Sequence, residues 1–141
     1  MRSTTVCAVA FMLVGVGPAT SLAHHSVSGQ FDLTKEVTLK GIVSGVDWGN
    51  PHIYVVLDVP EQNGTKATWK LETFPPAQMK RAGITKELIM GKPSEVVTAT
   101  IRPARDGALH LGYLERLTYQ DGHFYQLSSN EEEQLRRRGG Q

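Results

Sequence analysis

The chain of 141 residues contains 15 lysines and arginines and 14 aspartates and glutamates, which gives a formal net charge of +1. This balance provides no basic field, so a nucleic-acid-binding function is not expected. The only cysteine, Cys7, lies in the N-terminal apolar stretch, so no disulfide can stabilise the rest of the chain. A hydrophobic core must stabilise it instead, and residues 24–141 are enough for one domain.

Residues 1–23 have the three parts of a secretory signal peptide. Arg2 provides a positive charge, residues 6–16 are apolar, and residues 18–23 are mostly small. The apolar run is shorter than the roughly 20 residues that a membrane span requires. We therefore predict cleavage near Ala23 and a periplasmic or secreted protein without a membrane span after cleavage. The alternative is an uncleaved N-terminal anchor.

Alternating apolar residues predict a long first strand over residues 36–48. The apolar positions are odd up to Leu39 and even from Ile42 to Trp48. One extra residue in a strand moves every later side chain to the other face, so this change of parity predicts a β-bulge at Gly41.

Two further strands follow, with a hairpin between them. The Gly-Asn-Pro sequence at 49–51 ends the first strand, and alternation resumes over residues 53–59. Asn63-Gly64 is a typical hairpin dipeptide, and it separates this second strand from a third over residues 67–74.

A short helical segment is predicted after the third strand. Pro75-Pro76 can begin a helix but cannot lie inside one, which favours a helix over residues 76–82 that ends at Gly83. A second helical turn is expected over residues 85–90, before Gly91.

Strand periodicity then returns over residues 97–101 and 109–119, and a last short strand is expected over residues 124–127. A mainly β chain with a bent first strand and a short helix between strands three and four predicts a small five-stranded OB-like barrel. Closing the sheet also removes exposed edges. The competing architecture is an open antiparallel sheet or a small sandwich.

Three regions follow from this pattern: a signal peptide over residues 1–23, an OB-like β-domain over residues 24–127, and a polar tail over residues 128–141. The tail has three glutamates at 131–133 and three arginines at 136–138. We expect it to be solvated, and the alternative is one or two helical turns matched to the helix dipole.

Two motifs resemble a family of small exported bacterial proteins of unknown function. One is the Ala-His-His-Ser sequence at 23–26 that starts the mature chain, and the other is the Trp-x-Asn-Pro-His turn at 48–52. The resemblance covers most of residues 23–124. It implies an exported OB-like domain and brings no established activity. The chain departs from the family pattern at His123, where Arg or Lys is usual, and in its longer C-terminus.

Copper binding is the first candidate chemistry. Cleavage after Ala23 frees the α-amine of His24 beside its own imidazole and that of His25. Nitrogen donors in a flattened arrangement suit Cu(II). His52 is the best candidate for a further donor, because the preceding turn delivers it to the start of a strand. The more ordinary interpretation is a polar N-terminus with His52 as a turn residue.

Trp48, Tyr54 and Glu72 are the candidates for a ligand groove, since OB folds often use exposed aromatic residues. Tyr113 is a further candidate, whereas Trp69 shares the parity of the apolar positions and is expected in the core. We expect Glu72 and Asp58 to be two solvated acids, and the alternative is a carboxylate pair if the neighbouring strands align them.

The sequence therefore predicts an exported, non-enzymatic binding or accessory module for an unknown protein partner or small ligand. No catalytic residue is assigned, because no nucleophile motif accompanies the two acids. The alternative is a copper-binding periplasmic protein that uses His24 and a second histidine, and an enzyme ranks third.

Overall fold

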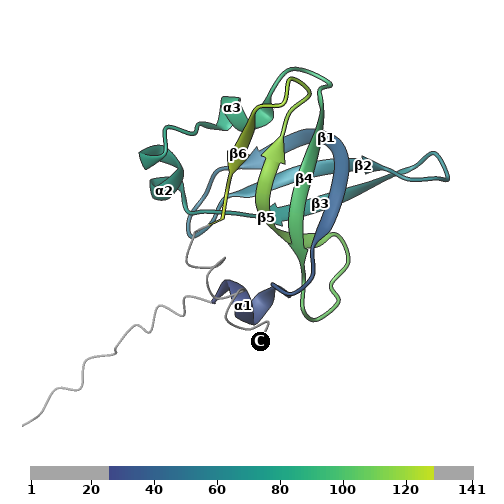
Figure 1. Cartoon of the computed structure of the whole chain (residues 1–141), viewed down its shortest axis with the longest axis horizontal. Coiled ribbons are helices and arrows are strands. Elements are labelled where there is room, and N and C mark those ends of the chain that lie inside the picture. Colours follow the sequence, from purple (N-terminus) through teal and green to yellow (C-terminus); the bar gives the residue numbers. More distant parts are fainter. Residues whose placement is uncertain (1–25, 129–141) are drawn as a thin grey trace, which may run out of the picture.

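The computed structural model describes residues 26–128. It contains six strands and three short helices, arranged as a small barrel with the helices on its outside (Figure 1). In chain order the elements are α1 (Val27–Gln30), β1 (Val37–Asp47), β2 (Tyr54–Pro60), β3 (Lys66–Glu72), α2 (Pro76–Arg81), α3 (Lys86–Met90), β4 (Val96–Pro103), β5 (Leu111–Thr118) and β6 (Phe124–Gln126). The predicted signal peptide and nearly all of the predicted tail lie outside the described residues.

The sheet closes on itself, as the OB-like prediction requires. Its strands follow the order β3-β2-β1-β4-β5-β6, with antiparallel neighbours. A short parallel pairing between β3 and β5, from Lys70↔Leu111 to Glu72↔Tyr113, completes a barrel of five strands. The sixth strand, β6, extends the sheet beside β5. The mainly β class, the barrel and the helical segment between the third and fourth strands are all confirmed.

The bulge in β1 lies further along the strand than predicted. Val43 pairs with Leu57 of β2, but Gly45 pairs with Val56, so Ser44 is the extra residue. The prediction of a bulge at Gly41 is wrong because it placed Ile42 on the core side, whereas Ile42 is 38% exposed. Because Ile42 is apolar although it lies on the outer face, the apparent change of parity falls at Gly41, about three positions before the bulge at Ser44.

One continuous core fills the barrel. Its buried members come from all five barrel strands and from the helical segment: Leu39, Val43, Val46, Ile53, Val55, Leu57, Leu71, Met79, Ile84, Ile89, Val97, Ala99, Ile101, Leu114, Leu117, Tyr119 and Leu127. Trp48 and Trp69 are half-buried against it. The alternation of apolar residues predicted that Trp69 lies in the core, and the structure places it there only in part.

The helical segment between β3 and β4 is held to the barrel by two fully buried side chains, Met79 of α2 and Ile89 of α3. Pro76 begins α2, as expected of a residue without a backbone donor. The hydroxyl of Thr85 accepts a hydrogen bond from the backbone N–H of Leu88 and caps α3. The two helices are too short to be stable alone, so these core contacts fix their position.

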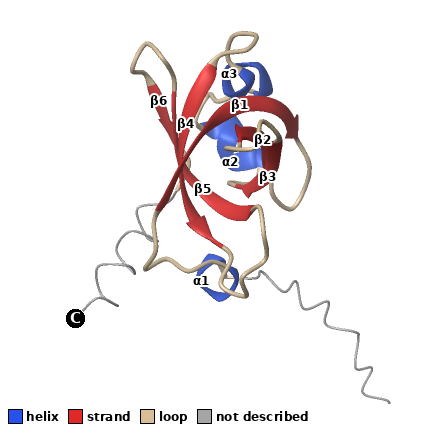
Figure 2. Ribbon diagram, turned by 90° about the vertical axis from the view of Figure 1, so that its right-hand side faces the viewer, coloured by secondary structure: helices blue, strands red, loops and turns tan. Residues whose placement is uncertain are grey.

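The N-terminal segment forms a second, smaller core outside the barrel. Phe31 and Leu33 are buried against Tyr113 of β5, and Val27 packs at the edge of this cluster. Tyr113 is 2% exposed, so it is not available as the groove residue that the sequence suggested. Figure 2 shows α1 on the opposite side of the barrel from α3.

The fifth strand begins two residues later than predicted, at Leu111. Leu109 follows the expected alternation, but it lies in the preceding loop and is 85% exposed.

Within residues 26–128, no helix is long and apolar enough to cross a membrane.

Candidate functional site

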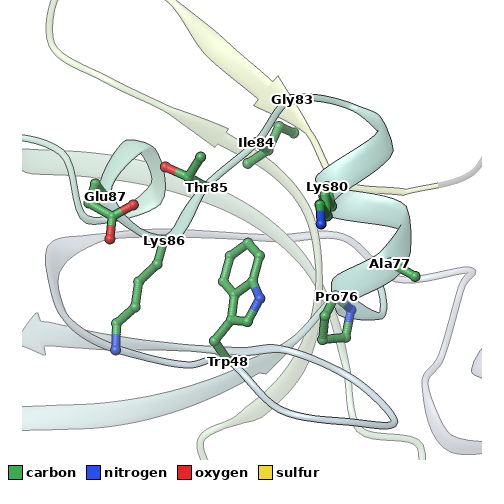
Figure 3. Close-up of a pocket in the computed structure, with 9 residues that line it drawn as sticks. All are labelled: Trp48, Pro76, Ala77, Lys80, Gly83, Ile84, Thr85, Lys86 and Glu87. Carbon is green, nitrogen blue, oxygen red and sulfur yellow. The ribbon is translucent and has the colours of Figure 1, made fainter.

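An open groove lies beside Trp48, where the end of β1 meets the helical segment. Trp48 forms one wall, and residues between Pro76 and Glu87 form the other (Figure 3). The groove has a volume of about 580 Å³, which is typical of sites for small molecules. Trp48, one of the three predicted groove residues, therefore lines a groove of the described chain.

Both walls are anchored in the core, so the groove is formed without a ligand. Trp48 directly follows the last residue of β1 and is half-buried. Across the groove, Ile84 is itself part of the barrel core. A rigid cleft reduces the ordering cost that a ligand must overcome on binding.

Two lysines line the groove, one from each helix. Lys80 belongs to α2 and Lys86 to α3, and both are exposed. The groove also contains the carboxylate of Glu87. Its pKa is lowered by a hydrogen bond from its own backbone and by one from Thr85, so the group is ionised at neutral pH. The groove thus combines an apolar surface with two ammonium groups and one carboxylate.

A polar cluster lies on the outer face of the barrel, next to the turn that follows Trp48, and consists of His52, Tyr54 and Glu72. Nδ1 of His52 lies 2.6 Å from Oε1 of Glu72. The hydroxyl of Tyr54 donates a hydrogen bond of 3.0 Å to Oε2 of the same carboxylate. The prediction that Glu72 is solvated is wrong, because the residue is only 4% exposed.

This arrangement orients the His52 ring. A carboxylate can only accept hydrogen bonds, so Nδ1 carries the proton and Nε2 keeps its lone pair in the neutral ring. The His52 side chain is 22% exposed. Metal-binding histidines are commonly held in this way by a carboxylate behind the ring.

Burial and the neighbouring charge of Glu72 raise the pKa of Tyr54 to about 12. The phenol therefore stays protonated and donates to Glu72 throughout the neutral pH range. Its ring is also covered by Lys70, whose Nζ lies 4.1 Å from the ring centroid. Tyr54 is thus a support for Glu72 and is not part of the groove wall.

The carboxylate pair considered from the sequence does not form. Tyr54 is the residue opposite Glu72 in the β2–β3 register, whereas Asp58 lies opposite Thr68. Asp58 accepts a hydrogen bond of 2.8 Å from Thr68 and forms an ion pair with Lys66. The two acids therefore lie in separate polar clusters.

Of the three predicted copper-binding residues, only His52 lies within the described residues. His24 and His25 lie outside the described residues. Among residues 26–128, no three His, Cys, Asp or Glu side chains are grouped as a metal site. The other two histidines interact elsewhere: His110 packs edge-on against Trp69, and His123 stacks on Tyr119.

The groove residues contributed by the helices were missed by sequence reasoning. Lys80 and Lys86 are ordinary exposed lysines in the sequence, and only the packing of α2 and α3 brings them to Trp48. The contact between Tyr54 and Glu72 had a signal, because the Asn63-Gly64 loop sets the register of the hairpin and places them opposite each other.

Comparison with known proteins supports the family resemblance. A family model described as a family of unknown function matches residues 12–113. No curated protein and no solved structure matches the chain significantly. Because the match covers more than half of its length, the chain belongs to this family of unknown function, DUF6152.

Proposed function

We propose that this protein is an exported, non-enzymatic binding module that holds a small, largely apolar ligand in the groove beside Trp48. The observation that carries the proposal is the groove itself, with its volume of about 580 Å³ and its wall formed by an indole ring. Export is supported by the signal-like residues 1–23.

The groove differs from an accidental surface hollow in how it is built. Short helices hold one wall and the barrel holds the other, and both contribute to one buried core. A half-buried tryptophan offers a large apolar contact area at a low cost in side-chain entropy. These features favour a preformed site for a compact ligand.

A neutral apolar dye, N-phenylnaphthylamine, tests the groove. Its fluorescence should rise when the folded protein is added, and Trp48→Ala should weaken binding about tenfold or more, as truncation of a central aromatic contact does. Ala77→Phe provides a second test, because Ala77 is an exposed residue at the edge of the groove, where a larger ring restricts access to the site.

Trp69→Phe is the matched control, since Trp69 packs against His110 and does not line the groove. This variant should bind the dye as the unsubstituted protein does. Unchanged dye affinity in both Trp48→Ala and Ala77→Phe would show that the groove is not the binding site.

Copper binding is the second candidate function, and the contact between His52 and Glu72 favours it. The buried carboxylate holds Nδ1 and leaves Nε2 as the donor atom, which is the arrangement that supports metal ligation. We propose that the freed N-terminus of His24 supplies the other nitrogens, with His25 as an additional imidazole.

The packing of the N-terminal segment is compatible with this pairing. Val27 packs at the cluster that contains Tyr113, and Tyr113 lies opposite Glu72 in the β3–β5 register. His24 is three residues before Val27, a separation that an extended chain covers in about 10 Å. We propose that this length is enough for His24 to approach the outer face that carries His52.

Equilibrium Cu(II) titration tests the copper proposal. Protein that begins at His24 is compared with protein that carries one additional N-terminal residue, and with His52→Gln. Both changes should weaken Cu(II) binding about tenfold or more, because each removes a donor nitrogen. His110→Gln is the control and should have no effect. If the added residue leaves affinity unchanged, the N-terminal copper site is wrong.

A further inference from the structure

We propose that the groove beside Trp48 selects apolar ligands that carry one anionic group, of the carboxylate or sulfonate class. This inference rests on the proposed binding function and specifies the chemical class of its ligand. Two observations support it: the charges of the lysines around the groove, and the indole N–H of Trp48, which donates to no group of the described chain.

The two groove lysines form no ion pair with an acidic side chain of the described residues. Among residues 26–128, no carboxylate lies within 4 Å of the ammonium group of Lys80 or Lys86. Elsewhere in the barrel, by contrast, Lys66 forms an ion pair with Asp58. The lysines at the groove are therefore available to an anion from solution.

Glu87 offsets only one of the two lysine charges, and the charge of Lys86 contributes to the lowered pKa of its carboxylate. Its carboxylate is held at the start of α3 by its own backbone and by Thr85. In Figure 3, Glu87 lies beside Thr85, away from the Trp48 ring. Two cations and one engaged carboxylate leave the groove with an excess of positive charge, which favours an anionic ligand over a neutral or cationic one.

Trp48 adds a directional donor. Within the part of the chain that the structure describes, no group accepts a hydrogen bond from its indole N–H. Figure 3 shows the indole nitrogen on the side of the ring that faces Pro76, where Lys80 also lies. An anionic oxygen placed there can accept from the indole N–H on the side of the groove that carries Lys80, and charge-assisted bonds to an ammonium group are the stronger class.

The rest of the ligand must be apolar and compact. Pro76 and Ile84 present carbon surface beside the Trp48 ring, and Ala77 lies at the edge of the groove. The indole face can stack on an aromatic or extended aliphatic body. Apolar surface supplies most of the binding free energy, and the anionic group supplies orientation and selectivity.

A matched pair of dyes tests the inference. Anilinonaphthalene sulfonate and N-phenylnaphthylamine share one ring system and differ in the sulfonate group. Fluorescence titration of the folded protein should show the anionic dye binding about tenfold more tightly, as expected for a charge-assisted contact. Added salt should weaken binding of the anionic dye and leave the neutral dye unaffected.

Lys80→Gln and Lys86→Gln should each reduce the preference for the anionic dye over the neutral dye, and the ratio of the two affinities should fall about fivefold or more for Lys80. Lys40→Gln is the control: this lysine is exposed on β1 and outside the groove. It should alter neither dye.

The outcomes separate the two proposals. Suppose that the unsubstituted protein binds both dyes equally well, that Ala77→Phe weakens both, and that neither lysine variant changes the ratio of the two affinities. The anion preference is then overturned, while the groove function stands. If neither dye binds, both proposals are overturned. An equal loss of affinity for both dyes in the lysine variants would also contradict the inference, because the lysines would then contribute contact area and no preference for an anion.

Discussion

Replacing Gly41 with alanine is expected to destabilise the barrel by about 3 kcal/mol, because the β1 backbone passes too close to β2 for any side chain. A Cβ atom at Gly41 would lie 2.3 Å from the carbonyl oxygen of Asp58 and 2.9 Å from its carbonyl carbon. Both atoms belong to the backbone, so a side-chain rotation cannot relieve the overlap. Urea unfolding followed by tryptophan fluorescence measures the loss.

Gly45→Ala is the matched control on the same strand. Its Cβ would meet only the Val56 side chain, at 3.8 Å, which is ordinary van der Waals contact. Alanine restricts the unfolded chain more than glycine does, so this variant should lie within about 0.5 kcal/mol of the unsubstituted protein. Equal stability of the two variants would contradict the argument that strand proximity requires glycine at Gly41.

Strand and helix positions were predictable because they depend on local patterns. Alternating apolar residues marked the strands, and Pro76 marked the start of α2. Closure of the barrel followed from the order of elements. The bulge was misplaced because Ile42 is apolar yet exposed, and a period of two cannot distinguish an exposed apolar residue from a buried one.

The candidate sites were predictable only in part. Trp48 stood out as an aromatic residue at the end of a strand, and His52 stood out because a turn delivers it to the next strand. The lysines of the groove carried no signal, because their position depends on Met79 and Ile89 entering the core. Burial of Glu72 also depends on tertiary structure, since its own strand gives it the parity of a polar residue.

The N-terminal segment is expected to be part of the fold, so Phe31→Ala should destabilise the protein by about 3 kcal/mol. Phe31 is 1% exposed, and its ring centroid lies 5.7 Å from that of Tyr113. The backbone beside it is tied to the barrel, because the N–H of Asp32 donates to the carbonyl of Pro103 at 2.9 Å. Urea unfolding measures the stability, and limited proteolysis reports release of the segment.

Phe124→Ala provides the comparison. Phe124 is 52% exposed and its ring contacts Arg116, so its removal should cost less than about 1 kcal/mol. Similar losses in the two variants would show that the N-terminal segment contributes little to folding.

Phe31→Ala also distinguishes the two proposed sites. The groove beside Trp48 is built from β1 and the helical segment, and α1 lies on the opposite side of the barrel from α3 (Figure 2). Dye binding should therefore survive in the folded fraction of this variant. Copper binding should weaken, because the segment that carries His24 would lose its attachment near Tyr113 and Glu72. Loss of both activities together would indicate that the two sites are coupled through the barrel.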